Sequence, residues 1–579
     1  MASSNKKKYL KFISSLEELL IDTVFTPMYL DILKEEIANT ELLIPIIGEF
    51  SAGKSSLLND FLGESILPVG LTPETELATE LRYCKENYIV AELVDGGSEK
   101  FAIDDFETIK YRAKDFSHLK AYLNNQHLKN IEPLVLVDMP GFGANIANHS
   151  KAINFYIPRG VFFIVLSSVE EGGLTQSMIR RLSELDNLER EFAVIVSKGN
   201  LRSPSEVAEI VDYISEQLAL NFDNNQKVAS IGNLQTKKLS ETINRINSET
   251  ILENLFLPQL KNSVHEIIDN ITISKNVKNN NQDLNEHTIR ELVRSIQNIE
   301  NKRESVISSL NSEYSNSVVN NCIDYVGKLL EQSQEELGSY LAKNNTDLLN
   351  STILEIIREG LSYKLKSELQ EVSSKVVMEF ENELKSLNAS MSDFGMNTHW
   401  ADEITERMRD ALEKTGGAVS NFNKYMSDKL TSENKDSKES KSIDHSKAIF
   451  RTVSTVVAVT TSVVAPIAEI IIIFLPEIIE FFTKRSREAK LKESVRTNLI
   501  PKVKQGLRQK LPDVIEEQVS KMINDIAQSF ENELDEKRAL IVKLESERNE
   551  KLSDINQEVL QLEQLKQEVL QLAEVSFHK

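Results

Sequence analysis

The stretch that most constrains the fold of this chain is a phosphate-binding loop placed between an apolar run and a helical pattern. It fits the spacing G-x-x-x-x-G-K-[ST], and its nine residues are Gly48, Glu49, Phe50, Ser51, Ala52, Gly53, Lys54, Ser55 and Ser56. Apolar residues 42–47 precede the loop, and apolar side chains at helical spacing follow it over residues 57–62. Glycines at this spacing let backbone N–H groups face a phosphate chain, and the start of the helix adds its positive end. The motif predicts an α/β domain that binds a nucleoside triphosphate.

A second motif follows the apolar run 134–137, where Asp138 is followed three residues later by Gly141. In this D-x-x-G arrangement the carboxylate holds Mg²⁺ and the glycine N–H meets the γ-phosphate. We expect Lys54 to reach the β- and γ-phosphates, and the Ser55 hydroxyl to join Asp138 on the metal ion.

The loop 71–75 carries two threonines before a predicted strand at 79–83. A hydroxyl from such a loop can complete the Mg²⁺ shell and position the attacking water. We expect Thr75 to have this role, with Thr72 as the alternative.

Composition narrows the class of protein. The chain has 579 residues and a formal net charge of -22, so it exceeds a single core and should be repelled by nucleic acid. Two cysteines cannot form a disulfide framework, and eight scattered histidines show no metal-ligand spacing. The start of the chain lacks the apolar core of a secretory signal, which favours a cytoplasmic protein.

Strand-like apolar runs alternate with helical segments from residue 42 to about 231, which predicts a mostly parallel sheet. Pro45 interrupts the first run, and we expect a bulge there because proline lacks a backbone N–H. Ser203 and Glu206 form a capping box with Pro204 at the first helical position, which marks a helix start. The expected strands are 42–47, 79–83, 89–94, 134–137, 161–166, 192–196 and 228–231.

The flanking segments predict long helices. Residues 5–40 show one amphipathic pattern with Pro27 as a break, and no proline occurs between Pro258 and Pro466. The C-terminal segment, with apolar positions from Leu534 onward, resembles a coiled-coil seam, although packing on the chain's own helices explains it equally well. The N-terminal helix is its natural partner.

Residues 448–482 form the most apolar segment, interrupted by Pro466 and Pro476 and flanked by basic side chains. It follows a polar stretch, 427–447, that we expect to be disordered. A spanning helix needs about 20 uninterrupted apolar residues. We therefore favour a membrane-inserting helical hairpin whose basic flanks meet anionic headgroups, with a buried core hairpin as the alternative.

The loop 48–59, the segment 67–75, the Asp-Met-Pro-Gly sequence at 138–141 and the long helical tail together resemble the dynamin superfamily. The bacterial dynamin-like proteins are the most similar branch. This resemblance implies a GTPase head, a helical neck built from both chain ends, and a helical trunk with a lipid-binding tip. The division it implies is 1–40 as an N-terminal neck helix, 41–250 as the GTPase domain, 251–447 as neck and trunk, 448–483 as an apolar tip hairpin, and 484–579 as returning helices.

The same resemblance implies the remaining site residues. Ser51 corresponds to a residue that contacts the phosphates near a head–head interface, whereas Phe50 replaces a glutamine that helps order the catalytic water. Lys198 and Asn200 occupy the guanine-reading motif, with Asn200 where aspartate is expected, which weakens guanine selection by about 1–3 kcal/mol. We expect GTP/GDP and Mg²⁺ as ligands, slow basal hydrolysis and pairing of heads.

Two functions follow from this reading. The first is a mechanochemical GTPase at the membrane periphery, which couples nucleotide state and head pairing to lipid binding or remodelling through 448–483. Bacterial relatives often act in pairs, so a second dynamin-like subunit is an expected partner. The second is a soluble GTP-dependent switch or scaffold that binds a protein through its helical arm.

Overall fold

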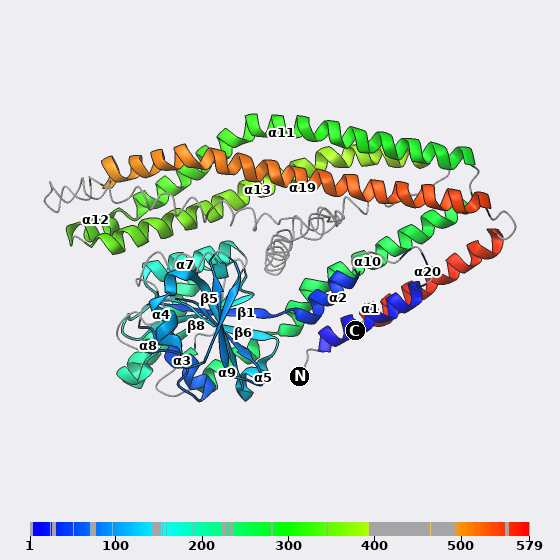
Figure 1. The fold of residues 1–579 in the computed structure, drawn as a ribbon. Coiled ribbons are helices and arrows are strands. Elements are labelled where there is room, and N and C mark those ends of the chain that lie inside the picture. The colour runs from blue at the N-terminus through cyan, green and yellow to red at the C-terminus, as the bar shows by residue number, and fades with distance from the viewer. Residues whose placement is uncertain are drawn as a thin grey trace.

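The computed structural model describes residues 4–392, 464 and 493–577, apart from short stretches that include 26–29, 70–76, 142–151, 223–228, 231–235 and 551–554. Three parts are visible in Figure 1: a head built on a β-sheet, a neck bundle of α1, α2, α10 and α20, and a trunk bundle of α11, α12, α13 and α19.

The head contains one sheet of nine strands in the order β4-β3-β5-β2-β6-β1-β7-β8-β9. Strands β1 and β6–β9 pair in parallel, as do β2 and β5, whereas β2 is antiparallel to β6 and β3 is antiparallel to both its neighbours. The expected α/β fold with a mostly parallel sheet and a long helical region is confirmed. The strands are β1 Leu42–Gly48, β2 Thr79–Tyr83, β3 Tyr88–Leu93, β4 Ser98–Phe101, β5 Phe116–Leu123, β6 Leu134–Asp138, β7 Phe162–Ser168, β8 Glu191–Ser197 and β9 Ala229–Ser230.

Pro45 lies within strand β1, where it interrupts the pairing with β7 but not the pairing with β6. The pairing of β1 with β6 is continuous from Leu42 to Ile46, so Pro45 causes no bulge there. On the β7 side Leu43 is paired with Gly160 and Ile46 with Ile164, which offsets the register by one residue across the proline. The missing N–H therefore falls at an interruption of the ladder, the place where a proline is tolerated.

Helices cover both faces of the sheet. The buried side chains of α3, α5 and α9 lie against one face, and those of α7 and α8 belong to a separate apolar cluster on the other. The capping box at the start of α8 forms as expected, with Ser203 and Glu206 bonded reciprocally. The helices of the head are α3 Lys54–Leu62, α4 Phe106–Tyr111, α5 Gln126–Ile131, α7 Gln176–Asn187, α8 Pro204–Asn221 and α9 Thr236–Arg245, with short 3₁₀ turns at Ala113–Asp115 and Gly199–Leu201.

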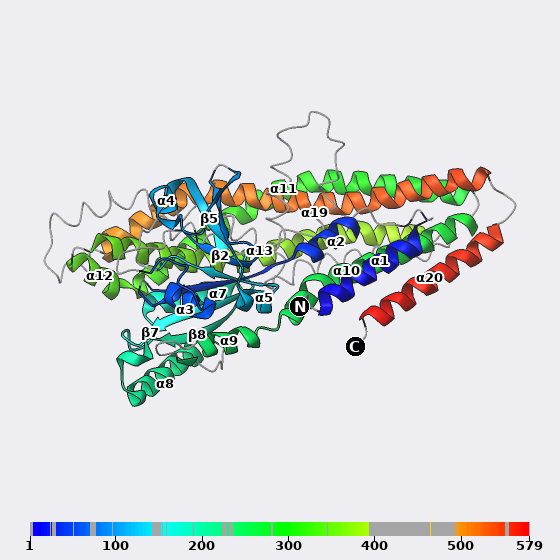
Figure 2. The same ribbon diagram turned by 60° about the horizontal axis from the view of Figure 1, so that its bottom comes forward.

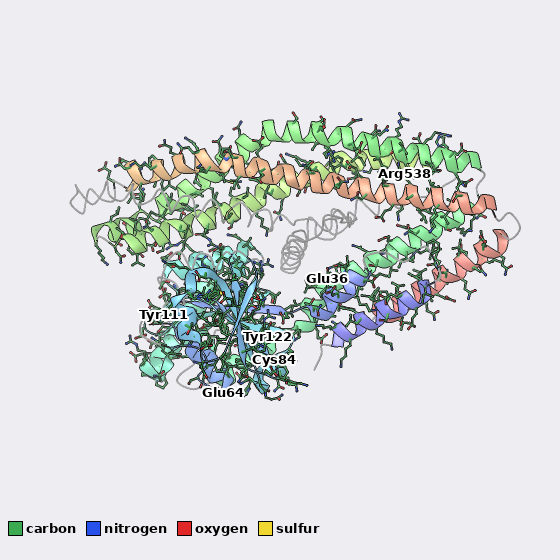
Figure 3. The ribbon with its side chains drawn as sticks, in the orientation of Figure 1. Glu36, Glu64, Cys84, Tyr111, Tyr122 and Arg538 are labelled. Atoms are coloured by element: carbon green, nitrogen blue, oxygen red, sulfur yellow. The ribbon has the colours of Figure 1, made fainter. Side chains whose placement is uncertain are left out.

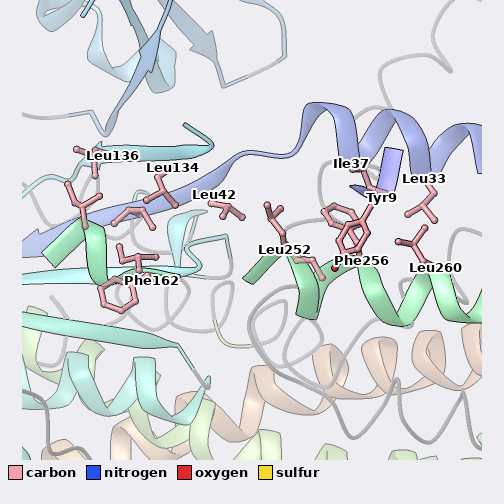
Figure 4. Close-up of a cluster of buried hydrophobic side chains, with 14 of the residues drawn as sticks. Tyr9, Leu33, Ile37, Leu42, Leu134, Leu136, Phe162, Leu252, Phe256 and Leu260 are labelled. Atoms are coloured by element: carbon pink, nitrogen blue, oxygen red, sulfur yellow. The ribbon is translucent and has the colours of Figure 1, made fainter. Parts of the chain in front are cut away.

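The neck bundle joins the head through a continuous apolar core. Side chains of α1, α2 and α10 and the near ends of β1, β6 and β7 belong to one buried cluster, which Figure 4 shows running from Phe162 and Leu134 to Tyr9 and Leu260. The N-terminal segment forms two helices rather than one, since α1 ends at Leu20 and α2 begins at Leu30, whereas Pro27 itself lies outside the described residues. The helices are α1 Ser4–Leu20, α2 Leu30–Asn39, α10 Ser248–Asn279 and α20 Ile555–Phe577.

Helix α1 lies against α20, where the rings of Phe12 and Phe577 are 4.6 Å apart. Helices α10 and α20 are further paired by Lys275 with Glu563 and by Lys278 with Glu558. The two ends of the chain therefore form one bundle, as both views of the ribbon show (Figures 1 and 2).

The trunk bundle turns back from the far end of the neck and passes over the head (Figures 1 and 2). Its apolar core runs through all four helices and includes Ile273 and Val277 at the end of α10, but it is a different cluster from the one that head and neck share. Helix α13 packs against α7 of the head. The trunk helices are α11 Gln282–Gln332, α12 Gln334–Ala342, α13 Thr346–Ser392 and α19 Ile500–Glu550, the last preceded by a π-helical turn at Val495–Leu499.

Among the described residues, no helix is both long enough and apolar enough to cross a membrane. The stretch 427–447 and the apolar segment 448–483 lie outside the described residues, apart from the single residue Val464.

Candidate functional site

The P-loop connects the end of β1 to α3 and has the backbone geometry of an anion site. Ser51 and Gly53 take left-handed conformations, with φ of 64° and 89°, which turn successive N–H groups to one side. Gly48 is required for packing, because a Cβ there would lie 2.6 Å from the carbonyl oxygen of Leu166 on β7. Phe50 lies outside the described residues.

Lys54 begins α3 and is almost completely buried. Its ammonium group donates to the carbonyl oxygens of Gly48 and Glu49, both at 3.1 Å. Burial lowers the pKa of Lys54 to about 8, although Asp138 and Glu49 act in the opposite direction. The side chain is thus folded back over the loop, where a phosphate chain would offer it stronger anionic partners.

Ser55 and Asp138 are brought together by the sheet, since β6 lies beside β1. The Ser55 hydroxyl donates to Asp138 Oδ2 at 2.6 Å. Asp138 is fully buried, and its Oδ1 finds no hydrogen-bond partner among the described residues. Burial raises the pKa of Asp138 to about 6, and Ser55 and Lys54 offset only part of this effect.

This donor set fits Mg²⁺, because an unpartnered buried carboxylate oxygen beside a hydroxyl is a site that a hard cation would complete. Gly141 follows Asp138 as a buried position at the same edge of the sheet. Thr75 and Thr72 lie outside the described residues, as does most of the loop that contains them.

The residues of the guanine-reading motif directly follow β8. Lys198 follows the strand with φ of 58°, and its ammonium group lies 2.5 Å from Glu170. Asn200 is exposed in the 3₁₀ turn that follows. The structure places Lys198 at the same sheet edge as the P-loop, because Ser197 directly before it donates to the carbonyl of Ala52 at 2.7 Å.

Two residues that support the P-loop were missed in the sequence. Ser197 holds the Ala52 carbonyl, and Thr175, the residue before α7, donates from Oγ1 to the Glu49 carboxylate at 2.6 Å. Thr175 also accepts from the N–H of Met178 and so caps α7. Its place before a helical pattern could have indicated a cap, but no local signal indicates the contact with Glu49, 126 residues away.

Comparison with known proteins supports this reading of the head. Residues 44–199 match the model of the dynamin family. The chain is 27% identical over 221 residues to Dynamin-like protein 2 of Campylobacter jejuni, an alignment that covers 38% of this chain and 35% of that protein. It is also 27% identical over 225 residues to Dynamin-like protein 1 of the same organism, covering 32% and 31%. These alignments span about a third of each relative's length.

A solved structure of an oligomerised bacterial dynamin pair aligns with 100% of this chain and 95% of its own, at 15% identity and a TM-score of 0.30. This score is too low to support a conclusion about the fold of this chain. The segment that contains the P-loop, Asp138 and Lys198 thus matches the dynamin family, the family that the motifs resemble.

Proposed function

We propose that this protein is a dynamin-like GTPase that binds GTP with Mg²⁺ and hydrolyses it to GDP. The observation that carries this proposal is the assembly of Lys54, Ser55 and the unpartnered Asp138 oxygen at one edge of the sheet. The dynamin-family match over residues 44–199 and the dynamin-like relatives support the reaction class.

In this mechanism the residues act mainly by positioning and by charge. The P-loop N–H groups and Lys54 would hold the β- and γ-phosphates, while Ser55 and Asp138 would hold the metal ion, with Thr75 as the further ligand. Bound Mg²⁺ would neutralise the charge that develops on the phosphoryl oxygens. The N–H of Gly141 meets the γ-phosphate, and Ser51 contacts the phosphates from the exposed side of the loop.

Nucleotide binding is tested with fluorescent GTP and ATP analogues on the purified full chain. Lys54→Ala should abolish binding while circular dichroism stays unchanged, and Lys85→Ala, at an exposed position of the head, is the matched control. Binding of the Lys54→Ala variant with wild-type affinity would refute the P-loop assignment.

Base selection rests on Lys198 and Asn200. Preference for GTP in the same assay would support guanine reading, whereas equal affinity for ATP would mean that Asn200 has removed it. Because the Asn200 amide offers one acceptor oxygen and no charge, we expect a preference weakened by about 1–3 kcal/mol relative to a carboxylate.

We further propose that heads pair to hydrolyse GTP and that slow basal turnover rises on pairing. Turnover per molecule, measured across a series of protein concentrations, should then increase with concentration. Turnover that stays constant over the series would exclude self-association through the head, and binding without turnover at any concentration would indicate a required second dynamin-like subunit.

Membrane binding through 448–483 belongs to the same proposal. Flotation with anionic vesicles at low salt, with the full chain and with a variant lacking 453–482, tests it directly. The alternative function is a soluble GTP-dependent switch or scaffold that binds a protein partner through its helical arm, and the packing of α13 on α7 supports it by connecting that arm to the head. If neither form of the protein floats, the switch is the better account.

A further inference from the structure

The motif that directly follows β8 ends in a short, open turn. Lys198 has a φ of 58°, and the N–H of Leu201 donates to the Lys198 carbonyl at 2.9 Å, which closes the 3₁₀ turn Gly199–Leu201. Asn200 lies in this turn as an exposed residue. Within the described part of the chain its side-chain amide makes no hydrogen bond. Both the amide oxygen and the NH₂ group are therefore available to a ligand.

This turn is held beside the P-loop. Ser197, the last residue of β8, donates from its hydroxyl to the Ala52 carbonyl at 2.7 Å. The ammonium group of Lys198 is paired with Glu170 at 2.5 Å. A nucleotide whose phosphates occupy the N–H groups of the P-loop therefore extends its base towards residues 198–200.

The carboxylates of the neighbouring loop are engaged by other groups. Glu170 is paired with Lys198, and Glu171 is hydrogen-bonded to Glu49 of the P-loop. Neither of them therefore replaces the carboxylate that the motif has lost at Asn200. The chemistry of the Asn200 amide itself decides which base fits this turn.

An amide reads a purine differently from a carboxylate. Guanine presents two donors on one edge, N1–H and the 2-amino group, and a carboxylate accepts both. Asn200 offers one acceptor, Oδ1, and one donor, Nδ2. With Oδ1 on N1–H, the Nδ2 group faces the 2-amino group, so that two donors meet and neither is satisfied; rotating the amide only exchanges the two positions. Asn200 therefore disfavours a 2-amino group in addition to losing a bond.

An oxygen at C2 of the purine removes this conflict. Xanthine carries the donor N1–H beside the acceptor C2 carbonyl. Oδ1 of Asn200 can accept from N1–H while Nδ2 donates to the C2 oxygen, which makes a pair of bonds on one edge. Hypoxanthine and adenine carry only hydrogen at C2, so each leaves one half of the amide without a partner. A two-bond contact to a base edge discriminates against the wrong base by about 10-fold or more.

We propose that the base site of this protein accepts a 2-oxopurine, so that xanthosine triphosphate (XTP) binds more tightly than GTP. The inference rests on the nucleotide binding proposed above and changes only the base that fits best. Asn200 is the specificity-determining residue, while the P-loop and Lys54 hold the phosphates of either nucleotide. We expect XTP to bind about 10-fold more tightly than GTP, with inosine triphosphate (ITP) between the two.

The test measures the affinities of ribose-labelled fluorescent XTP, ITP and GTP analogues for the purified full chain with Mg²⁺. In the wild-type chain, removal of the 2-amino group, from GTP to ITP, should raise affinity, and the C2 oxygen of XTP should raise it further. Asn200→Asp should reverse this order, because a carboxylate accepts from both donors of guanine and repels the C2 oxygen of xanthine.

Two variants control for the added negative charge. Asn244→Asp on α9 and Tyr111→Asp on α4 make the same change at exposed positions of the head, where Figure 3 labels Tyr111. Both should leave the order of the three affinities unchanged. Inorganic tripolyphosphate, which has no base, should displace the bound analogue from the wild-type chain and from Asn200→Asp equally, within the shift that the two control variants show.

The outcomes separate this inference from the proposed function. GTP that binds as tightly as XTP to the wild-type chain, or more tightly, overturns the inference and leaves nucleotide binding intact, and this comparison needs no variant. A preference for XTP that persists in Asn200→Asp also overturns it, because the choice of base would not be made by Asn200. A wild-type chain that binds none of the three analogues overturns both.

Discussion

Replacement of Asp138 by asparagine should stabilise the nucleotide-free protein while removing its response to Mg²⁺ and GTP. Asp138 is fully buried with one hydrogen-bonded oxygen, and burial raises its pKa to about 6 from an ordinary value of 3.8. A rise of about two pKa units corresponds to about 3 kcal/mol of unfavourable interaction for the ionised form. This shift already includes the attraction to Lys54, but the asparagine amide would be buried with one polar atom unpaired, so we expect a net gain of about 1–2 kcal/mol.

The gain in stability of Asp138→Asn over the wild-type chain should depend on pH. Because the folded-state pKa is the higher one, the folded protein binds the proton more tightly, and wild-type stability falls as pH rises from about 4 to 6. The loss becomes complete and constant about one pH unit above the folded-state pKa, near pH 7. Asp138→Asn should therefore match the wild-type chain near pH 4 and exceed it at pH 8.

Scanning calorimetry in the presence of a chelator measures the effect on the transition of the head. A gain of 1–2 kcal/mol in a region of this size should raise its midpoint by about 2–8 °C at pH 8. Asp104→Asn, at an exposed position, should change nothing. A lower midpoint for Asp138→Asn at pH 8 would refute the reasoning, as would a midpoint that still rises on addition of Mg²⁺ and GTP to the variant.

Three further changes have defined outcomes. Burial raises the pKa of Glu359, beside the contact between α7 and α13, to about 7, so that contact should weaken as pH rises from about 5 to 7; Glu359→Gln should reduce the pH dependence of the calorimetric midpoint over that range. Gly48→Ala places a methyl group 2.6 Å from the Leu166 oxygen, so it should cost about 1–3 kcal/mol by overpacking and reduce nucleotide affinity, seen in calorimetry and binding. Ser203→Ala removes the cap of α8 and should lower stability by about 1 kcal/mol with nucleotide affinity unchanged in the same two assays.

The P-loop and the strand that ends in Asp138 were predictable because their signals are local. A loop of nine residues carries its own glycines, lysine and hydroxyl, and a strand buried on both faces reads as an unbroken apolar run. The same holds for the capping box at Ser203, where cap and partner are three residues apart. Such features depend on neighbours along the chain rather than on the rest of the fold.

Strand β5 was missed because polar residues interrupt its pattern. His118 is buried in this strand next to Glu80 of β2, and Lys120 lies 2.7 Å from Glu92 of β3. Burial lowers the pKa of His118 to about 4, so it packs as a neutral side chain. When the partners of polar residues lie on neighbouring strands, the sequence alone does not show that these residues belong to a strand, because the partners are known only once the fold is known.

The charged residues of α7 show the same limit of prediction from the sequence. Along the sequence, Arg180 and Glu184 look like the solvated face of a surface helix, but both are buried because their partners, Glu336 and Arg358, lie 156 and 174 residues further on. Buried ion pairs add little net stability compared with an apolar contact of equal size. The neck is joined to the head by such an apolar contact, and the trunk is joined to it by charges instead. That difference in chemistry predicts that the contact between head and neck is the more stable of the two.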